Sequence, residues 1–99
     1  MNRKVTKISE IQLFKNLREL DLTGNMLQEV KELNSLNFLK NLNLSYNKIQ
    51  QLWMLPKRIE ILNLAHNQIK SMPEDVSKNL RNVTTIDVSS NKLESLENF

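Results

Sequence analysis

The stretch Leu17-Arg-Glu-Leu-Asp-Leu-Thr-Gly-Asn-Met-Leu27 decides how this chain folds, because its pattern of residues returns three more times. Apolar residues stand at its first, fourth, sixth and eleventh positions, and asparagine stands at its ninth. The three later copies begin at Leu39, Ile59 and Val83 and keep the same residue types at all five positions. A pattern that recurs every 20–24 residues predicts one structural unit repeated along the chain.

Around the fourth and sixth positions of each copy, apolar and polar residues alternate, which is the pattern of a short β-strand. The apolar residues are expected to point into each coil of the chain, and the residues between them to point out from a parallel sheet. The segments that return from one strand to the next differ. Apolar residues at 27, 30, 33 and 36 suit a helical or 3₁₀ turn. Pro56 ends any helix in the second return, and Pro73 with Glu74 and Asp75 predicts the first turn of a helix in the third.

One asparagine in each copy forms a column along the repeats: Asn25, Asn47, Asn67 and Asn91. The intervals between them are 22, 20 and 24 residues. A buried amide must have its hydrogen-bonding groups satisfied. We therefore expect each asparagine to bond main-chain groups of its own coil and of the neighbouring coil, so that the column is structural rather than functional.

These intervals and the motif Leu-x-x-Leu-x-Leu-x-x-Asn-x-Leu resemble leucine-rich repeat proteins. The resemblance implies an α/β solenoid, a right-handed superhelix with a parallel β-sheet on the concave face and irregular, 3₁₀ or short helical segments on the convex side. We expect a single domain over residues 1–99. It would contain a half repeat at 1–16, repeats starting near 17, 39, 59 and 83, and an incomplete repeat at the C-terminal end. Repeats one and two are similar to the short intracellular class, which includes a regulatory subunit of type-1 phosphatase, an axonemal dynein light chain and centrosomal scaffolds.

The composition restricts where the protein works and what it binds. No cysteine is present, which excludes a disulfide framework and a thiol nucleophile. The basic amino terminus is not followed by the apolar run of a signal peptide, and no stretch approaches the ~18 apolar residues of a membrane-spanning helix. We therefore expect a cytoplasmic protein, with the cytoskeleton, the centrosome and the nucleus as other intracellular destinations. The net charge of +3 comes from basic residues interleaved with acidic ones, which argues against a nucleic-acid partner.

Residue types that carry out catalysis do not gather in this sequence. His66 is the only histidine, and without cysteine or a second histidine it is a poor metal ligand. A single glycine, Gly24, excludes a glycine-rich phosphate loop. We expect no enzymatic activity, no cofactor, no metal and no small-molecule substrate.

The resemblance implies binding through the concave sheet, and the register of the repeats identifies its side chains. Tyr46 and Ile61 are expected anchors, because a few buried side chains carry most of the affinity at an interface and tyrosine is enriched among them. The acidic residues suit a protein partner that presents lysine or arginine. The candidate partner-binding residues are Glu19, Asp21, Asn41, Asn43, Tyr46, Ile61, Asn63, His66, Thr85 and Asp87.

The function that this pattern predicts is a non-catalytic protein–protein interaction domain, an intracellular adaptor, targeting or scaffold module. Open ends of the solenoid would also allow self-association. Two alternatives stay open. One is a segment of an extracellular leucine-rich repeat receptor, since the segment from Leu64 to Pro73 resembles repeats of Toll-like receptors and Asn43 and Asn82 begin Asn-x-Ser/Thr triplets. The other is a regulatory domain of a larger enzyme complex.

Overall fold

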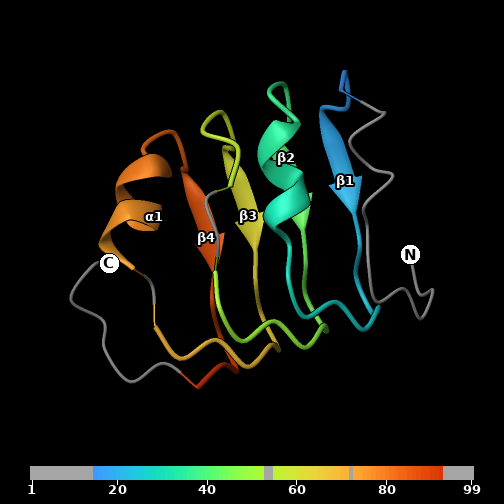
Figure 1. Ribbon diagram of the computed structural model, residues 1–99, viewed down its shortest axis with the longest axis vertical. Helices are drawn as coiled ribbons and strands as arrows, with labels where there is room; N and C mark the ends of the chain where they lie inside the picture. Colours follow the sequence, from blue (N-terminus) through green and yellow to red (C-terminus); the bar gives the residue numbers. More distant parts are fainter. Residues whose placement is uncertain (1–14, 53–54, 72, 93–99) are drawn as a thin grey trace.

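The computed structural model describes residues 15–52, 55–71 and 73–92, and it contains one sheet of four parallel strands. The strands follow one another in the sheet in the order of the sequence (Figure 1). They are β1 (Glu19–Asp21), β2 (Asn41–Asn43), β3 (Ile61–Asn63) and β4 (Thr85–Asp87). The parallel sheet and the repeats together confirm a solenoid-like leucine-rich repeat fold, whereas the handedness of the superhelix stays a prediction.

Each coil aligns with the next residue for residue, so equivalent positions of the repeat lie side by side. Leu42 in the centre of β2 pairs with Leu20 in β1 and with Leu62 in β3, and Leu62 pairs in turn with Ile86 in β4. Main-chain hydrogen bonds continue beyond the strands, for example from Tyr46 N–H to the Ala65 carbonyl at 3.0 Å. The sequence pattern therefore becomes a set of straight columns that run across the sheet.

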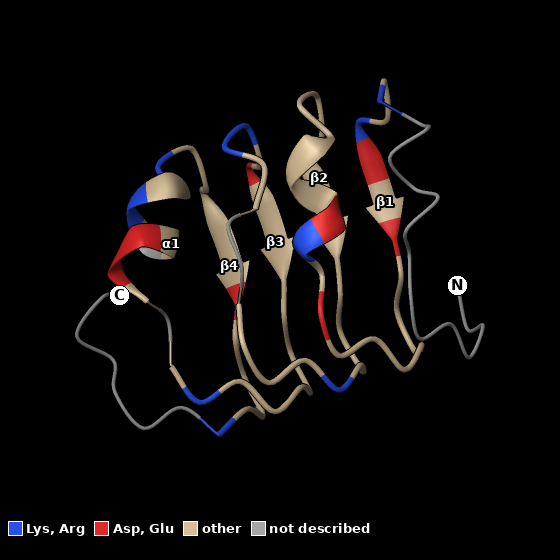
Figure 2. Cartoon of the chain, in the orientation of Figure 1, with Lys and Arg blue, Asp and Glu red and all other residues tan. Residues whose placement is uncertain are grey.

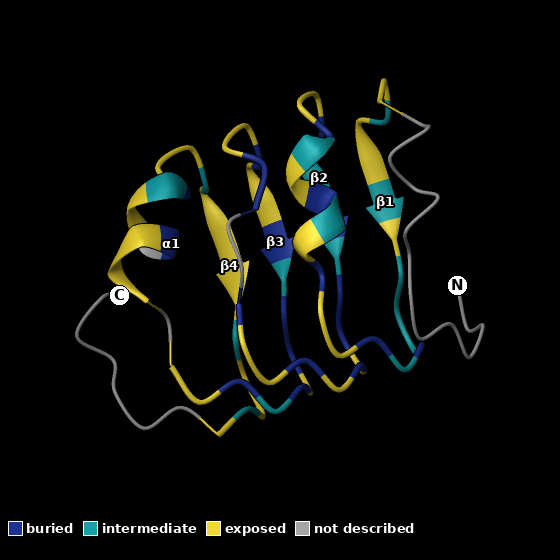
Figure 3. Ribbon diagram, in the orientation of Figure 1, coloured by how far each residue is buried: buried dark blue, intermediate teal, exposed yellow. Residues whose placement is uncertain are grey.

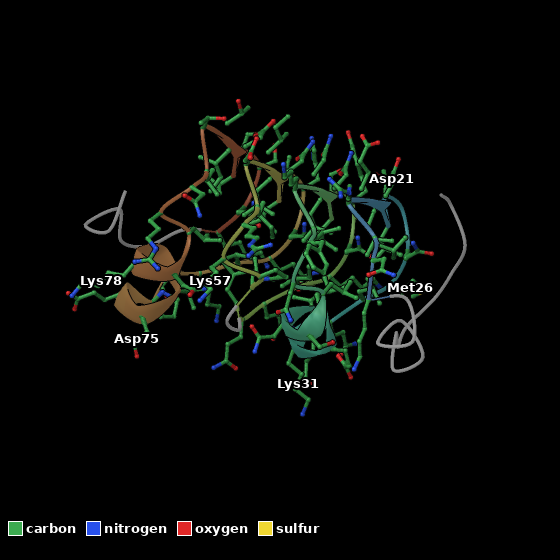
Figure 4. All side chains as sticks on the ribbon, turned by 90° about the horizontal axis from the view of Figure 1, so that it is seen from above. Asp21, Met26, Lys31, Lys57, Asp75 and Lys78 are labelled. Carbon is green, nitrogen blue, oxygen red and sulfur yellow. The ribbon has the colours of Figure 1, made fainter. Side chains whose placement is uncertain are left out.

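Two short helical segments lie on the side of the coils away from the sheet (Figures 1 and 4). A 3₁₀ helix, η2, spans Lys31–Ser35, and an α-helix, α1, spans Glu74–Asn79. Both confirm the expectations for the first and third returns, and α1 begins directly after Pro73 with two acidic residues in its first turn. The described residues of the second return contain no helix, in agreement with the position of Pro56.

The core fills the space between the sheet and the return segments (Figure 3). Side chains of the two middle coils are fully buried, among them Leu42, Leu44 and Ile59. Truncating a buried leucine of this kind to alanine costs about 2–5 kcal/mol. In contrast, Leu20 and Leu22 are half-buried and Ile86 is 38% exposed, although the same positions of the repeat are buried in β2 and β3. They lie in the two outer strands or, for Leu22, directly after one, where the described residues place a neighbouring coil on one side only.

Parts of the expected repeat organisation lie outside the described residues. They are the half repeat at 1–16, except for its last two residues, and the C-terminal incomplete repeat beyond residue 92. Trp53 and Met54 also lie outside them. The division of residues 1–99 into these units therefore stays a prediction.

The column of asparagines, called here the asparagine ladder, links each coil to the preceding one by hydrogen bonds. The Asn67 amide donates to the carbonyls of Leu64 in its own coil, at 3.0 Å, and Leu44 in the preceding coil, at 2.9 Å. Its Oδ1 atom accepts the N–H of Ile49 at 3.1 Å. Asn47 and Asn91 repeat this arrangement, and Asn25 donates to the carbonyl of Leu22. Because these groups bond to main chain in the interior, the column fixes the turn that follows every strand.

Candidate functional site

The side chains that point away from the core form a surface over the four strands, called here the sheet face. Strand register places them in two rows. Figure 4 shows Asp21 on this side of the molecule and Lys31 of η2 on the opposite side. The first row is Glu19, Asn41, Ile61 and Thr85, and the second row is Asp21, Asn43, Asn63 and Asp87.

The second row holds the ends of the strands in place. Oδ1 of Asn43 accepts the N–H of Ser45, two residues further on, at 3.0 Å, and the Ser45 hydroxyl donates to the same oxygen at 2.7 Å. Asp21, Asn63 and Asp87 accept the equivalent N–H group in their own coils at 2.9–3.0 Å. This is the Asx turn, in which an aspartate or asparagine side chain closes a turn of its own backbone. This role was not predicted from the sequence, although the Asp/Asn-x-Ser/Thr triplet that occurs in three of the four coils could have indicated it.

Hydrogen bonds in these turns keep the two aspartates charged. The side-chain and main-chain groups of Thr23 donate to Asp21 and hold the pKa of its carboxyl below the usual 3.8. The main-chain N–H of Ser89 lowers the pKa of Asp87 in the same way, and His66 adds a smaller contribution. Both carboxylates therefore stay negative at every pH above about their ordinary pKa.

A third column, called here the left-handed column, lies beside the sheet face. Each of its members directly precedes an asparagine of the ladder in the sequence. Its members all adopt positive φ angles: Gly24 at 72°, Tyr46 at 58°, His66 at 58° and Ser90 at 55°. Glycine accepts this left-handed conformation without strain, whereas the other residues adopt it at a cost. The rings of Tyr46 and His66 are stacked, with centroids 4.2 Å apart and planes 10° apart. The common backbone conformation aims neighbouring side chains in one direction and so produces this aromatic pair.

Exposed apolar surface on the sheet face is limited to a few positions among the described residues. The aromatic pair includes Tyr46, which is 57% exposed, and Ile61 in the first row is 44% exposed. Ser45 and Ala65, which follow the second row, are both 5% exposed and offer little contact area. A hollow of about 370 Å³ lies over β1 and β2, lined by Glu19, Leu20, Asp21, Asn41 and Asn43.

The two rows of the sheet face carry acidic but no basic side chains. Glu19, Asp21 and Asp87 give them three negative charges, and the remaining members are amides, Ile61 and Thr85. Figure 2 shows lysines and arginines in the segments before and after the strands and in the two helices instead. The structure thus brings all ten predicted residues to one side of the sheet, as two rows and an adjoining aromatic pair. Whether they bind a partner stays a prediction.

Within the described ranges, the structure shows no group of three or more histidine, cysteine, aspartate or glutamate residues placed to hold a metal ion. The helices in those ranges are also too short and too polar to cross a membrane. The chemistry available on the sheet face is that of charge, hydrogen bonding and aromatic contact.

Comparison with known proteins agrees with this geometry. Three models of leucine-rich repeats match the chain, one of them a two-copy model over residues 57–99, and the others over residues 16–37 and 35–51. The chain is similar to mimecan of Homo sapiens, with 34% identity over 85 residues, which is 82% of this chain and 28% of that protein. Mimecan of Bos taurus is 33% identical over the same shares, and mimecan of Gallus gallus is 30% identical over 90% of this chain and 32% of its own length.

These relatives correct the expected localisation. Mimecan is a secreted proteoglycan of the extracellular matrix, so the cytoplasmic prediction is wrong, and the cytoskeleton receives no support. The error came from reading a compartment out of the missing cysteines. This chain spans only about 28–32% of the length of the relatives it matches. The absence of cysteine describes these 99 residues and does not decide a compartment.

The repeat models cover both the first strand and the last, and the ladder of asparagines joins the coils between them. A leucine-rich repeat domain implies protein interaction, and the relatives also point to a non-enzymatic interaction module. The resemblance to the intracellular short-repeat class receives no support from them. The sequence pattern, the parallel sheet and the matching models together identify this chain as a leucine-rich repeat protein.

Proposed function

We propose that this chain is a non-catalytic domain of the extracellular space that binds a protein partner through its sheet face. The observation that carries the proposal is the combination of a polar floor fixed by Asx turns with an exposed aromatic pair at its border. The relatives support the extracellular setting, although they are matrix proteoglycans rather than the receptors considered from the sequence.

Rigidity of the sheet face favours binding. Its second row is held by hydrogen bonds to its own backbone, and its strands are hydrogen-bonded to their neighbours. Association normally costs free energy for ordering side chains and loops at the interface. Side chains that are already fixed lose less freedom, so more of the contact energy remains as affinity.

The charges of the sheet face select the partner. Glu19, Asp21 and Asp87 are exposed, and the pKa values of the two aspartates are lowered by hydrogen bonds. A partner segment with lysine or arginine complements these charges, and such complementarity raises specificity and the rate of association. Tyr46 and Ile61 offer the apolar contacts that such a polar surface otherwise lacks.

The test is affinity capture from a salt extract of extracellular matrix, with the wild-type chain compared with the Tyr46→Glu/Ile61→Glu variant. We expect a protein that the wild type retains and the variant loses, and we expect rising salt to weaken its retention. Mass spectrometry identifies the protein. Its binding to the purified chain, measured by surface plasmon resonance, then shows whether the contact is direct.

The matched control is Gln28→Glu/Ser71→Glu, which adds the same two negative charges on exposed residues outside the sheet face. We expect this control to retain the partner. Circular dichroism and thermal melting establish that each variant is folded. Equal retention by wild type and Tyr46→Glu/Ile61→Glu would rule out the sheet face as the binding surface.

A further inference from the structure

Basic residues gather along the edge of the sheet at which the strands begin. Because the strands are parallel, the segments that enter them all lie at this edge, the strand-start edge. Within the described ranges these segments contain six basic residues and one acidic residue, Glu60, while Glu19 begins β1. Figure 2 shows the blue segments above β1, β3 and β4. The basic residues are Lys15, Arg18, Lys40, Lys57, Arg58 and Arg81, and all six are exposed.

Within the described ranges, the structure shows no ion pair for these six residues. The ion pair that it shows there joins Lys78 to Glu74 in α1. Arg58 lies over the ring of Phe38, with its guanidinium carbon 5.3 Å from the ring centroid. Among the described residues, therefore, no ion pair compensates the positive charges of this edge. Like charges in a row repel one another, and an anionic ligand would relieve that repulsion.

Spacing along the edge follows the spacing of the strands. Neighbouring strands in a sheet are about 4.8 Å apart, so four of them span roughly 14 Å. Every coil contributes at least one cation to this span, since Arg18, Lys40, Lys57 and Arg81 come from four successive coils. Arg18 and Lys40 occupy one position of the repeat, and Lys57 and Arg81 occupy another. Cations spread over this length fit an extended polymer with several anionic groups better than they fit a single small anion.

A hollow opens from the same edge on the helical side of the coils. It has a volume of about 580 Å³, and Lys57 and Arg58 line it together with Asn34, Asn37, Asn79 and Phe38. It lies between η2 and α1, where the repeat from Asn47 to Asn67 is only 20 residues long while its neighbours have 22 and 24. Two cations and the amides of Asn34 and Asn37 supply donors for sulfate or carboxylate groups, whereas the Asn79 amide donates to the Leu55 carbonyl.

We propose that the strand-start edge and this hollow bind a linear sulfated polysaccharide. The relatives are secreted proteins of the extracellular matrix, which is the compartment where such polymers occur. A nucleic acid fits less well. Proteins hold single strands largely by stacking the bases on aromatic rings. In the described part of the chain, the aromatic ring at this edge is that of Phe38, and the guanidinium of Arg58 already lies over it. Helix α1, with six residues, is too short to read the major groove of a duplex.

The experiment measures binding of a heparin oligosaccharide of defined length by isothermal titration calorimetry at several salt concentrations. The edge variant is Lys40→Ser/Lys57→Ser/Arg81→Ser. The control is Lys48→Ser/Lys70→Ser/Lys92→Ser, which removes three exposed lysines outside the strand-start edge. Both variants change the net charge from +3 to 0, so they differ only in which cations are missing.

We expect the edge variant to lose roughly 10- to 100-fold in affinity and about two units of the slope of log K against log salt. The control should stay within about threefold of the wild type. Equal losses in both variants, or no binding by the wild type, would overturn the proposal. A duplex DNA of similar length that binds as tightly, and is lost in the same variant, would also overturn it by showing a general response to polyanions.

This proposal stands on a different surface from the proposed function, and the two can fail separately. The single variant Tyr46→Glu should keep its affinity for heparin, because Tyr46 follows the far end of β2 and does not line the hollow. The edge variant should in turn keep the protein partner of the sheet face. Circular dichroism spectra and melting temperatures of all variants show whether any loss reflects unfolding.

Discussion

Replacing Asn67 by alanine tests how much the ladder contributes to stability. The substitution removes the donors to the carbonyls of Leu44, Leu64 and Ala65 and the acceptor for the Ile49 N–H. Asn67 is 6% exposed and Ile49 is fully buried, so water cannot replace these bonds without opening the coil. A buried polar group left unpaired costs about 1–3 kcal/mol. The three carbonyls each keep a second donor, from Asn47, Asn91 and the Tyr46 N–H, so the Ile49 N–H is the group left unpaired. We therefore expect the free energy of unfolding to fall by about 1–3 kcal/mol.

Asn91 provides the matched comparison. It makes the same set of contacts, to the carbonyls of Leu64, Val88 and Ser89 and from the N–H of Ile69, but it is only half-buried. Water can reach groups at this position, and hydrogen bonds to water offset much of the loss. We expect Asn91→Ala to cost about 0.5–1 kcal/mol.

Urea unfolding followed by circular dichroism measures both values, because the transition midpoint multiplied by the slope gives the free energy of unfolding. The two variants should differ clearly in their free energy of unfolding. Equal losses for Asn67→Ala and Asn91→Ala would refute burial as the reason for the cost. A loss below about 1 kcal/mol for Asn67→Ala would refute the assignment of the ladder as a stabilising element.

Three further predictions concern the turns and the surface. Ser90→Gly should raise the free energy of unfolding by about 0.5–1 kcal/mol, because glycine adopts the positive φ without strain. Tyr46→Gly should gain less, since it also removes the aromatic stack, and thermal melting compares the two. Hydrogen bonds from Ser89 lower the pKa of Asp87 below 3.8, so its charged form stabilises the fold above that pH, and the contribution is lost as pH falls through the lowered pKa. The stability of wild type relative to Asp87→Asn, measured by urea unfolding from pH 7 to pH 2, should decline only in that acidic window. If the chain is secreted from animal cells, Asn82 should carry a glycan and Asn43 should not, because Asn82 is exposed and Asn43 is half-buried in a middle strand. The measurement is a mass shift on deglycosylation, which should be absent in Asn82→Gln.

Much of the fold could be predicted because one side-chain pattern determines both the strand and its place in the coil. Leu42, Leu44 and Ile59 are buried where the pattern puts them, and Pro56 and Pro73 separate the returns with and without a helix. The exposure of Ile86 could not be predicted from its position in the repeat, because it depends on what covers the outer strand rather than on the residue itself.

The site was predictable only as a set of positions. Alternation places Asn43 and Ile61 on the sheet face, but it does not show that Asn43 is engaged by its own backbone while Ile61 is open to a partner. The stacking of Tyr46 on His66 depends on the positive φ of both residues, which the apolar pattern does not contain. The prediction of localisation was wrong for a different reason, because the composition of these 99 residues does not determine the compartment of the protein.

The left-handed column has a consequence for how such a protein acquires new specificity. Gly24, Tyr46, His66 and Ser90 share one backbone conformation, yet their side chains range from a hydrogen atom to a phenol. The turn and the asparagine that follows each of these residues impose the conformation. The side chain at this position therefore does not have to pack in the core. Substitutions there alter the pattern displayed to a partner while leaving the folding information intact. Recognition and foldability can therefore evolve in separate columns of the same short repeat.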